Sequence, residues 1–219
     1  MSRSICYVEP KMAKAGEVRT WRFIYAPASP LPEGTKLRFD LLARGREIDW
    51  QLPQAGSRIK KNGIWLELGD GTLVAGEIVD DAGKYEFTLP SAVKDGEQLV
   101  IRMGSAGDDD KGNRCQTLIQ RRRPFHLFID PKGKGDYKEP ELFTLDIKGA
   151  PLDSIRVVSP SLVAKNERFD IVIRFEDAFG NLTNNAPEGT LIELSYSQLR
   201  ENISWKLFVP ETGFINLPN

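Results

Sequence analysis

Side chains that could carry out chemistry are few and scattered in this sequence. The chain has one histidine, His126, and two cysteines, Cys6 and Cys115, which lie far apart. A structural zinc site needs about four ligands, and a disulfide framework needs more cysteines than two. We therefore expect reduced, structural thiols and a structural histidine. These residues predict no catalytic centre, no metal site and no cofactor.

Three consecutive arginines, Arg121-Arg122-Arg123, are the strongest local cluster of charge. Guanidinium groups bind phosphates and carboxylates through paired hydrogen bonds. In a regularly alternating strand, only Arg121 and Arg123 would share a face. The alternative is a solvated sheet edge, where such charge is common.

The four tryptophans could form a platform on which a sugar stacks. Trp21, Trp65 and Trp205 fall on predicted strands, where packing in the core is the usual role of tryptophan. Trp50 adjoins a polar stretch, 51–62, and is the best candidate for exposure. The candidate ligand contacts are therefore Trp50, Arg121 and Arg123.

Two acidic segments could offer oxygen ligands to Ca²⁺. The first is Asp108-Asp109-Asp110 with Asn113, and the second is the turn from Asp130 to Asp136. A calcium loop spaces its ligands around a glycine and ends with a bidentate acid. Neither segment has that spacing, so we expect solvated loops, with at most a weak cation at the first.

The pattern of apolar residues predicts an all-β fold. From Arg168 to Phe175, apolar and polar residues alternate with the period of a strand that is buried on one face. Short apolar runs separated by Gly, Pro and Asp are typical of a β-sandwich. The predicted strands cover residues 6–10, 17–25, 35–42, 48–52, 63–68, 72–79, 84–89, 97–103, 114–120, 124–130, 143–148, 154–159, 168–175, 190–196 and 203–209.

An internal repeat predicts two tandem modules. Residues 10–41 return as 160–196, with Trp21, Phe23 and Tyr25 matching Ile171, Ile173 and Phe175. The tetrapeptide Pro32-Glu-Gly-Thr35 also returns, as Pro187-Glu-Gly-Thr190. We expect two immunoglobulin-like sandwiches, 1–149 and 150–219, the second of them incomplete because it is shorter than about 100 residues.

Composition narrows the classes of partner. The chain has 30 basic and 31 acidic residues, a balance that argues against binding to nucleic acid or to an anionic membrane. No apolar run approaches the roughly 20 residues of a membrane span. The first ten residues lack the apolar region of a signal peptide, which predicts a cytoplasmic protein.

Several segments together resemble the N-terminal region of a large bacterial family of domain-of-unknown-function proteins. They are AKAGEVRTWRFIY from Ala13, LVIRMGSAGDDDKGNRCQT from Leu99, FHLFIDPKGKGDY from Phe125, and RVVSPSLVAKNERFDIVIRFEDAFGN from Arg156. In that family, β-modules precede a C-terminal domain similar to PHP-type (polymerase and histidinol phosphatase) metallohydrolases.

The resemblance implies that this chain is a non-catalytic accessory region of a larger metal-dependent hydrolase. Its partner would be the C-terminal domain of the same polypeptide, which would hold the catalytic metal ligands. The alternative is a self-contained module that binds a carbohydrate or a protein, as many sandwich domains do.

Overall fold

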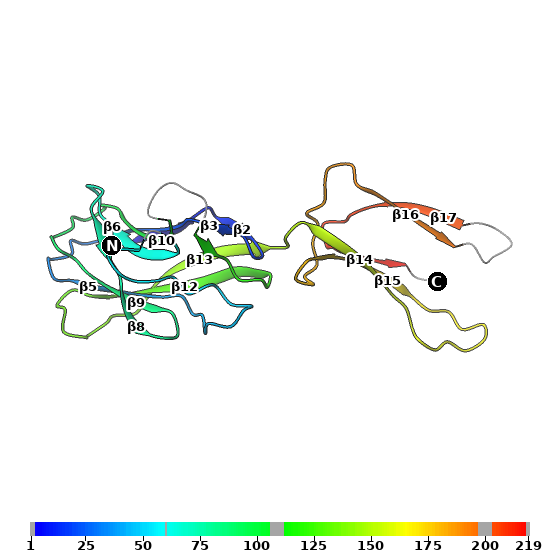
Figure 1. Ribbon diagram of the computed structural model, residues 1–219, viewed down its shortest axis with the longest axis horizontal. Helices are drawn as coiled ribbons and strands as arrows, with labels where there is room; N and C mark the ends of the chain where they lie inside the picture. Colours follow the sequence, from blue (N-terminus) through cyan, green and yellow to red (C-terminus); the bar gives the residue numbers. More distant parts are fainter. Residues whose placement is uncertain (1–2, 60, 106–111, 197–202, 218–219) are drawn as a thin grey trace. The chain divides into compact units, whose positions relative to one another are not determined.

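The structure is a computed structural model that describes residues 3–59, 61–105, 112–196 and 203–217 (Figure 1). Every regular element in these residues is a β-strand, so the prediction of an all-β fold is confirmed. The chain divides into two compact units, Met1–Ile147 and Lys148–Asn219.

The first unit contains two large antiparallel sheets. The five-stranded sheet has the order β1 (Ile5–Glu9), β4 (Trp21–Ala26), β10 (Leu99–Gly104), β6 (Gly63–Glu67) and β7 (Leu73–Ala75). The six-stranded sheet has the order β2 (Met12–Lys14), β13 (Glu141–Lys148), β12 (Gln120–Asp130), β5 (Lys36–Asp40), β9 (Lys84–Thr88) and β8 (Glu77–Asp80). A small additional pair joins β3 (Val18–Arg19) to β11 (Asn113–Arg114).

An aromatic cluster joins the two large sheets. Phe23 on β4 lies 4.9 Å from Phe39, 4.7 Å from Phe125 and 5.7 Å from Phe143, measured between ring centroids. The last three rings belong to β5, β12 and β13 of the other sheet, and all four side chains are fully buried. Because buried rings from the two sheets pack against one another, the sheets form a sandwich.

The second unit is smaller. It has a three-stranded sheet in the order β14 (Leu152–Val158), β15 (Ile171–Asp177) and β18 (Phe214–Leu217). A separate pair consists of β16 (Leu191–Tyr196) and β17 (Ile203–Phe208). Ile173 and Phe175 on the central strand β15 are completely buried.

The two units contain matching turns. The N–H of Lys14 donates to the carboxylate of Glu17 at 2.8 Å, and the N–H of Ala164 donates to that of Glu167 at 3.0 Å. In the Pro-Glu-Gly-Thr turns, the hydroxyls of Thr35 and Thr190 donate to the carbonyls three residues earlier, each at 2.6 Å. The repeated residues therefore make the same local hydrogen bonds in each unit.

The strands that precede the two copies of the repeat, β1 and β14, pair with β4 and β15 in slightly different registers. Val8 of β1 lies opposite Phe23, whereas Val157 of β14, and not Val158, lies opposite Ile173. Phe23 and Ile173 are both buried, as the repeat predicts. The two hairpins are thus offset by one residue.

The segment predicted as one strand over 72–79 is two strands in different sheets. β7 joins the five-stranded sheet and β8 the six-stranded sheet, with Gly76 between them. A Cβ at Gly76 would lie 3.0 Å from the Phe87 ring and 3.1 Å from Ile64. The chain therefore crosses from one sheet to the other where only a glycine fits without displacing the core.

Two other predicted strands are wrong, and two strands were missed. Residues 48–52 form a loop, and of 114–120 only the first and last residues belong to strands. β2 and β18 were not predicted, because each is so short that alternation gives no clear signal.

A half-buried carboxylate on β9 of the six-stranded sheet provides a test of stability against pH. Glu86 accepts hydrogen bonds from Lys36 at 2.8 Å, from Arg38 at 3.0 Å and from the hydroxyl of Tyr137. Partial burial would raise the pKa of Glu86, but these donors outweigh it and lower the pKa to about 2.

Glu86→Gln should lower the free energy of unfolding by about 1–2 kcal/mol at pH 7, an amount reduced because Lys36 and Arg38 are partly solvated. Since the folded-state pKa is depressed, the advantage of the native chain is complete above the ordinary glutamate pKa of 4.5. It should fade as the pH drops from there towards 2. Urea titrations across this range measure it, with the exposed Glu33→Gln as the control; a constant difference would contradict the prediction.

Candidate functional site

Trp50 lies in the core of the first unit, and the expectation that it is exposed is wrong. Its side chain is fully buried, with its ring 5.0 Å from Trp21 and 5.2 Å from Phe125. The loop at 41–54 leaves β5 and turns inward at Trp50, where the indole fills the space beside these rings. Trp21 and Trp65 are also buried, so the alternative of core packing is correct for these three tryptophans.

Asn113, considered above as a possible Ca²⁺ ligand, is instead a buried polar centre of the first unit. Its side chain accepts from the indole N–H of Trp50 at 2.5 Å and donates to the carbonyl of Gln51 at 2.9 Å and to Asn62 at 2.7 Å. Its backbone carbonyl accepts from the indole N–H of Trp21 at 3.0 Å. Asn113 is fully buried and so serves as an internal connector. Asp108, Asp109 and Asp110 lie outside the described residues.

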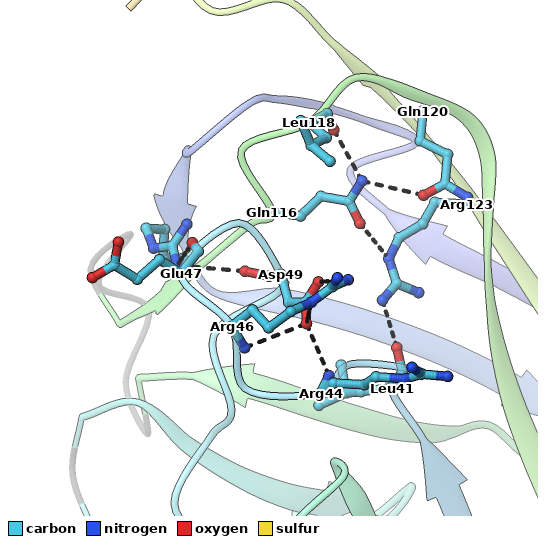
Figure 2. Close-up of polar contacts among 10 residues, drawn as sticks. Leu41, Arg44, Arg46, Glu47, Asp49, Gln116, Leu118, Gln120 and Arg123 are labelled. Atoms are coloured by element: carbon cyan, nitrogen blue, oxygen red, sulfur yellow. Dashed lines mark hydrogen bonds and ion pairs between the residues drawn. The ribbon is translucent and has the colours of Figure 1, made fainter. Parts of the chain in front are cut away.

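Arg123 is also buried, on the inner face of β12 (Figure 2). Its guanidinium donates to the side chain of Gln116 at 2.8 Å, to the carbonyl of Leu41 at 2.5 Å and to the carbonyl of Pro124. It also lies 4.3 Å from the centre of the Phe125 ring and 5.6 Å from that of Trp50.

Figure 2 shows two of the acceptors of Arg123, the side chain of Gln116 and the carbonyl of Leu41. Burial lowers the pKa of Arg123 to about 10, which still leaves the group charged at neutral pH. A buried charge that is held by carbonyl oxygens and aromatic faces contributes to the packing of the core. Arg123 is therefore not placed to contact a ligand from solvent.

A β-bulge explains why Arg121 and Arg123 do not share a face. Gln120 pairs with Ile147 and Arg123 with Leu145, so Arg121 and Arg122 both lie opposite the single residue Asp146. The extra residue reverses the alternation, which leaves Arg121 and Arg122 exposed and turns Arg123 inward. The prediction of a shared face is wrong for this reason.

The loop that carries Trp50 is fixed by the charged network of Figure 2. The carboxylate of Asp49 accepts from the backbone N–H groups of Arg44 and Arg46 and from the Arg46 guanidinium, at 2.8–3.3 Å. These hydrogen bonds, the Arg46 side chain first, outweigh burial and lower the pKa of Asp49. Arg114 donates to the carbonyl of Glu47 at 2.7 Å. These charged groups are therefore used to hold the loop.

A polar cavity lies beside Arg122 in the first unit. A cavity of about 300 Å³ is lined by β1, the bulge and β13, through Cys6, Tyr7, Val8, Lys11, Arg122, Thr144 and Asp146. Arg122 has a positive φ of 51°, and its N–H donates to Asp146 at 2.7 Å. The bulge thus directs a cationic side chain to the cavity, beside Lys11.

The thiol in this cavity is not activated. Burial, with a contribution from the Glu141 carboxylate, raises the pKa of Cys6 to about 12. Burial likewise raises the pKa of Cys115 to about 12, and both cysteines are free. Burial therefore disfavours the thiolate, which is the nucleophilic form, at both cysteines. The cavity is suited to binding a polar or anionic group through Lys11 and Arg122.

The carboxylates of Asp177 and Asp130 accept hydrogen bonds from backbone N–H groups. Asp177 accepts from the N–H groups of Ala150, Phe179 and Asn181, each at 2.9 Å. Asp130 accepts from the N–H groups of Lys132 and Gly135, at 3.1 and 2.5 Å. Each carboxylate therefore stabilises its own turn, as expected for a structural role.

Within the described ranges, no group of three or more His, Cys, Asp and Glu side chains is arranged to hold a metal ion. His126 lies on β12 with its ring 6.0 Å from Phe128. A search of the same residues finds no helix with the length and apolar character needed to cross a bilayer.

Relatives of this chain are found in Chlamydia. An uncharacterized protein of Chlamydia pneumoniae is 48% identical over 227 aligned residues, which cover all of this chain and 37% of the relative. Uncharacterized proteins of Chlamydia trachomatis and Chlamydia muridarum are 51% and 50% identical with the same coverage. The chain thus spans about 37% of the length of the relatives it matches.

Matches to solved structures are remote, and no protein-family model matches the chain. An alkylpurine DNA glycosylase of Pseudomonas fluorescens, bound to DNA with an abasic site analogue, is 11% identical with a TM-score of 0.25; the match covers 68% of this chain and 31% of that one. A chicken TCR is 10% identical with a TM-score of 0.33, and the match covers 98% of this chain and 89% of that one. TM-scores this low do not establish a shared fold. This all-β chain is therefore similar to one region of longer Chlamydia proteins.

Proposed function

We propose that this chain is a non-catalytic β-sandwich accessory region of a larger metal-dependent hydrolase. The proposal rests on one observation: several polar and charged side chains that could take part in chemistry are hydrogen-bonded within the fold. Arg123, Asn113, Asp177 and Glu86 are each held by several intramolecular hydrogen bonds. Groups engaged in this way support a scaffold and are not free to act on a substrate.

Two further observations support a region of a larger hydrolase. The relatives are much longer than this chain, which corresponds to 37% of each. The segments at Ala13, Leu99, Phe125 and Arg156 resemble a family whose C-terminal domain is similar to PHP-type metallohydrolases. In such an enzyme the catalytic metals would bind to that domain, and the β-modules would position it or shield its substrate.

The matching turns favour an origin of the two units from one immunoglobulin-like module. Equivalent carboxylates at Glu17 and Glu167 cap equivalent turns, and the Pro-Glu-Gly-Thr turns share their hydroxyl bond. The one-residue difference in strand register is compatible with divergence after duplication. A tandem arrangement of this kind suits a spacer or a platform for another domain.

The proposal is tested by comparing this chain with the full-length polypeptide. Both are screened against phosphoesters with Mn²⁺ or Zn²⁺, and metal binding is measured by calorimetry. We expect turnover and tight metal binding only in the full-length protein. Turnover by the 219-residue chain itself would overturn the accessory role, and its dependence on His126 would be checked with His126→Ala.

A second candidate function is a self-contained binding module for a carbohydrate or a protein. The cavity beside the Arg122 bulge favours it, because Tyr7, Lys11, Arg122 and Asp146 there combine an aromatic surface with polar groups. Titration with neutral and acidic oligosaccharides, followed by calorimetry, tests this function. Binding that is lost in both Lys11→Ala and Arg122→Ala would favour the module over the accessory role.

A further inference from the structure

The inner face of the second unit is defined by its strand pairing. Ile155 of β14 lies opposite Phe175 of β15, and Val157 lies opposite Ile173. Ile173 in turn lies opposite Ile215 of β18. Residues directly opposite each other in antiparallel strands point to the same side of a sheet. These five apolar side chains therefore share one face.

Burial of this face is uneven. Ile173 and Phe175 on the central strand are fully buried, but Ile155 is 43% exposed and Val157 is 58% exposed. We call Ile155 and Val157 the β14 apolar pair. The described residues therefore cover the central strand β15 but leave Ile155 and Val157 on β14 exposed.

The opposite side of the same strands is mostly charged, although the valine pair Val158 and Val172 also lies there. Arg156 of β14 lies opposite Arg174 of β15, and both form ion pairs with Glu176, at 2.8 and 2.9 Å. A strand that alternates between apolar and charged residues has one face meant for a core and one for water. The exposure of the β14 apolar pair is thus contrary to the pattern of its own strand.

The first unit shows what a covered equivalent looks like. Val8 on β1 lies opposite Phe23, as Val157 lies opposite Ile173, but Val8 is only 1% exposed. There the five-stranded sheet is matched by a six-stranded one, whereas the second unit has a three-stranded sheet and a two-stranded one. The second unit therefore has fewer strands available to cover its edge.

The two-stranded sheet also leaves apolar groups in solvent. Leu191 of β16 and Phe208 of β17 lie opposite each other, and they are 48% and 70% exposed. Leu191 and Phe208 thus form an exposed apolar pair across the two strands, and sites of interaction in soluble proteins use exposed apolar side chains. Both sheets of the second unit thus present apolar side chains that the described residues do not cover.

We propose that the β14 apolar pair is the docking surface for another segment of the same, longer polypeptide. That segment would pack apolar side chains over Ile155 and Val157. This inference deepens the proposed accessory role and rests on it. It identifies where the accessory region meets the rest of the protein.

The choice of occupant follows from the length of the relatives. In three relatives that are 48–51% identical, this region is joined covalently to a much longer chain. A tethered segment acts at an effective concentration of roughly millimolar, so it competes well against a second copy or a separate protein. The occupant should be apolar, because the charged groups of β14 lie on the other face.

Cysteine labelling along β14 tests the proposal. Ile155→Cys, Arg156→Cys and Val157→Cys are made both in the 219-residue chain and in the full-length protein, and the rates of maleimide modification are compared. Arg156→Cys is the matched control, because it lies between the other two but on the opposite face. Labelling of the parent chain gives the background from Cys6 and Cys115.

In the 219-residue chain, all three cysteines should react at similar rates. In the full-length protein, the cysteines at 155 and 157 should react at least about 10-fold more slowly, as expected for groups that are exposed only by local opening. The control at 156 should be unchanged. Equal rates at 157 in both proteins would overturn the proposal.

Other outcomes identify other occupants and also overturn the proposal. Protection in the 219-residue chain that rises with protein concentration would indicate a second copy, and protection there at every concentration would place the cover within this chain. The result is separate from that of the turnover assay. An unprotected Val157→Cys in an active full-length hydrolase would contradict the docking surface alone, while protection with catalysis in the short chain would contradict the accessory role alone.

Discussion

Asn113→Ala should lower the free energy of unfolding of the first unit by about 3–5 kcal/mol. The substitution removes the acceptor of the Trp50 indole and the donor to Gln51 and Asn62, all within a fully buried site. Each buried polar group that loses its partner costs about 1–3 kcal/mol. A domain is stable by only about 5–15 kcal/mol, so the loss should be plain in urea titration monitored by tryptophan fluorescence.

Two further variants make this prediction specific. Lys134→Ala, on an exposed turn, should change stability by less than about 0.5 kcal/mol. Trp50→Phe removes the indole donor, so its effect should not add to that of Asn113→Ala, with a coupling of about 1 kcal/mol or more. Additive effects, or a loss below that of a surface change, would show that Asn113 does not connect the loop to the core.

Regular strands could be predicted from the sequence because burial on one face imposes a simple alternation. Phe23, Phe39 and Phe125 sit at inward positions of predicted strands and meet in the core. The turns of the repeat could be recognised as well, since Glu17 and Glu167 are in the right place to accept the bond of a tight turn. Local periodicity and turn chemistry are properties of neighbouring residues, which is why the sequence displays them.

The polar interior could not be predicted in the same way. Trp50 adjoins a polar stretch, yet the loop turns inward, and its partner Asn113 lies far along the chain. A buried asparagine and a solvated one look alike in sequence, because the difference is made by contacts between distant segments. The same holds for Arg123, whose guanidinium donates to the carbonyl of Leu41, just after the end of β5.

The bulge at Arg121 and Arg122 shows how one residue reverses an inference about a site. Alternation predicts that Arg121 and Arg123 point together, but one extra residue opposite Asp146 sends them apart. The same bulge brings Arg122 to the cavity at β1. Arg122, which was not singled out, therefore lines the cavity, while Trp50 and Arg123, which were singled out, are buried in the core.

The second unit has so small a core that a single truncation should have a large effect. Phe175→Ala removes a fully buried ring from the central strand and should cost about 3–5 kcal/mol, the range for deleting a large aromatic from a core. Ile155 lies directly opposite Phe175 on the same face but is 43% exposed. Ile155→Ala in the 219-residue chain should therefore cost less than about 1 kcal/mol, because little apolar area leaves the core.

The contrast between these cross-strand neighbours is the sensitive part of the measurement. Both substitutions shorten an apolar side chain on one sheet, so differences in strand propensity largely cancel between them. Hydrogen exchange of the β14 and β15 amides, read beside urea titration, reports on the second unit by itself. Equal small losses at both positions would mean that Phe175 is not in a packed core, and equal large losses would mean that β14 is already covered within this chain.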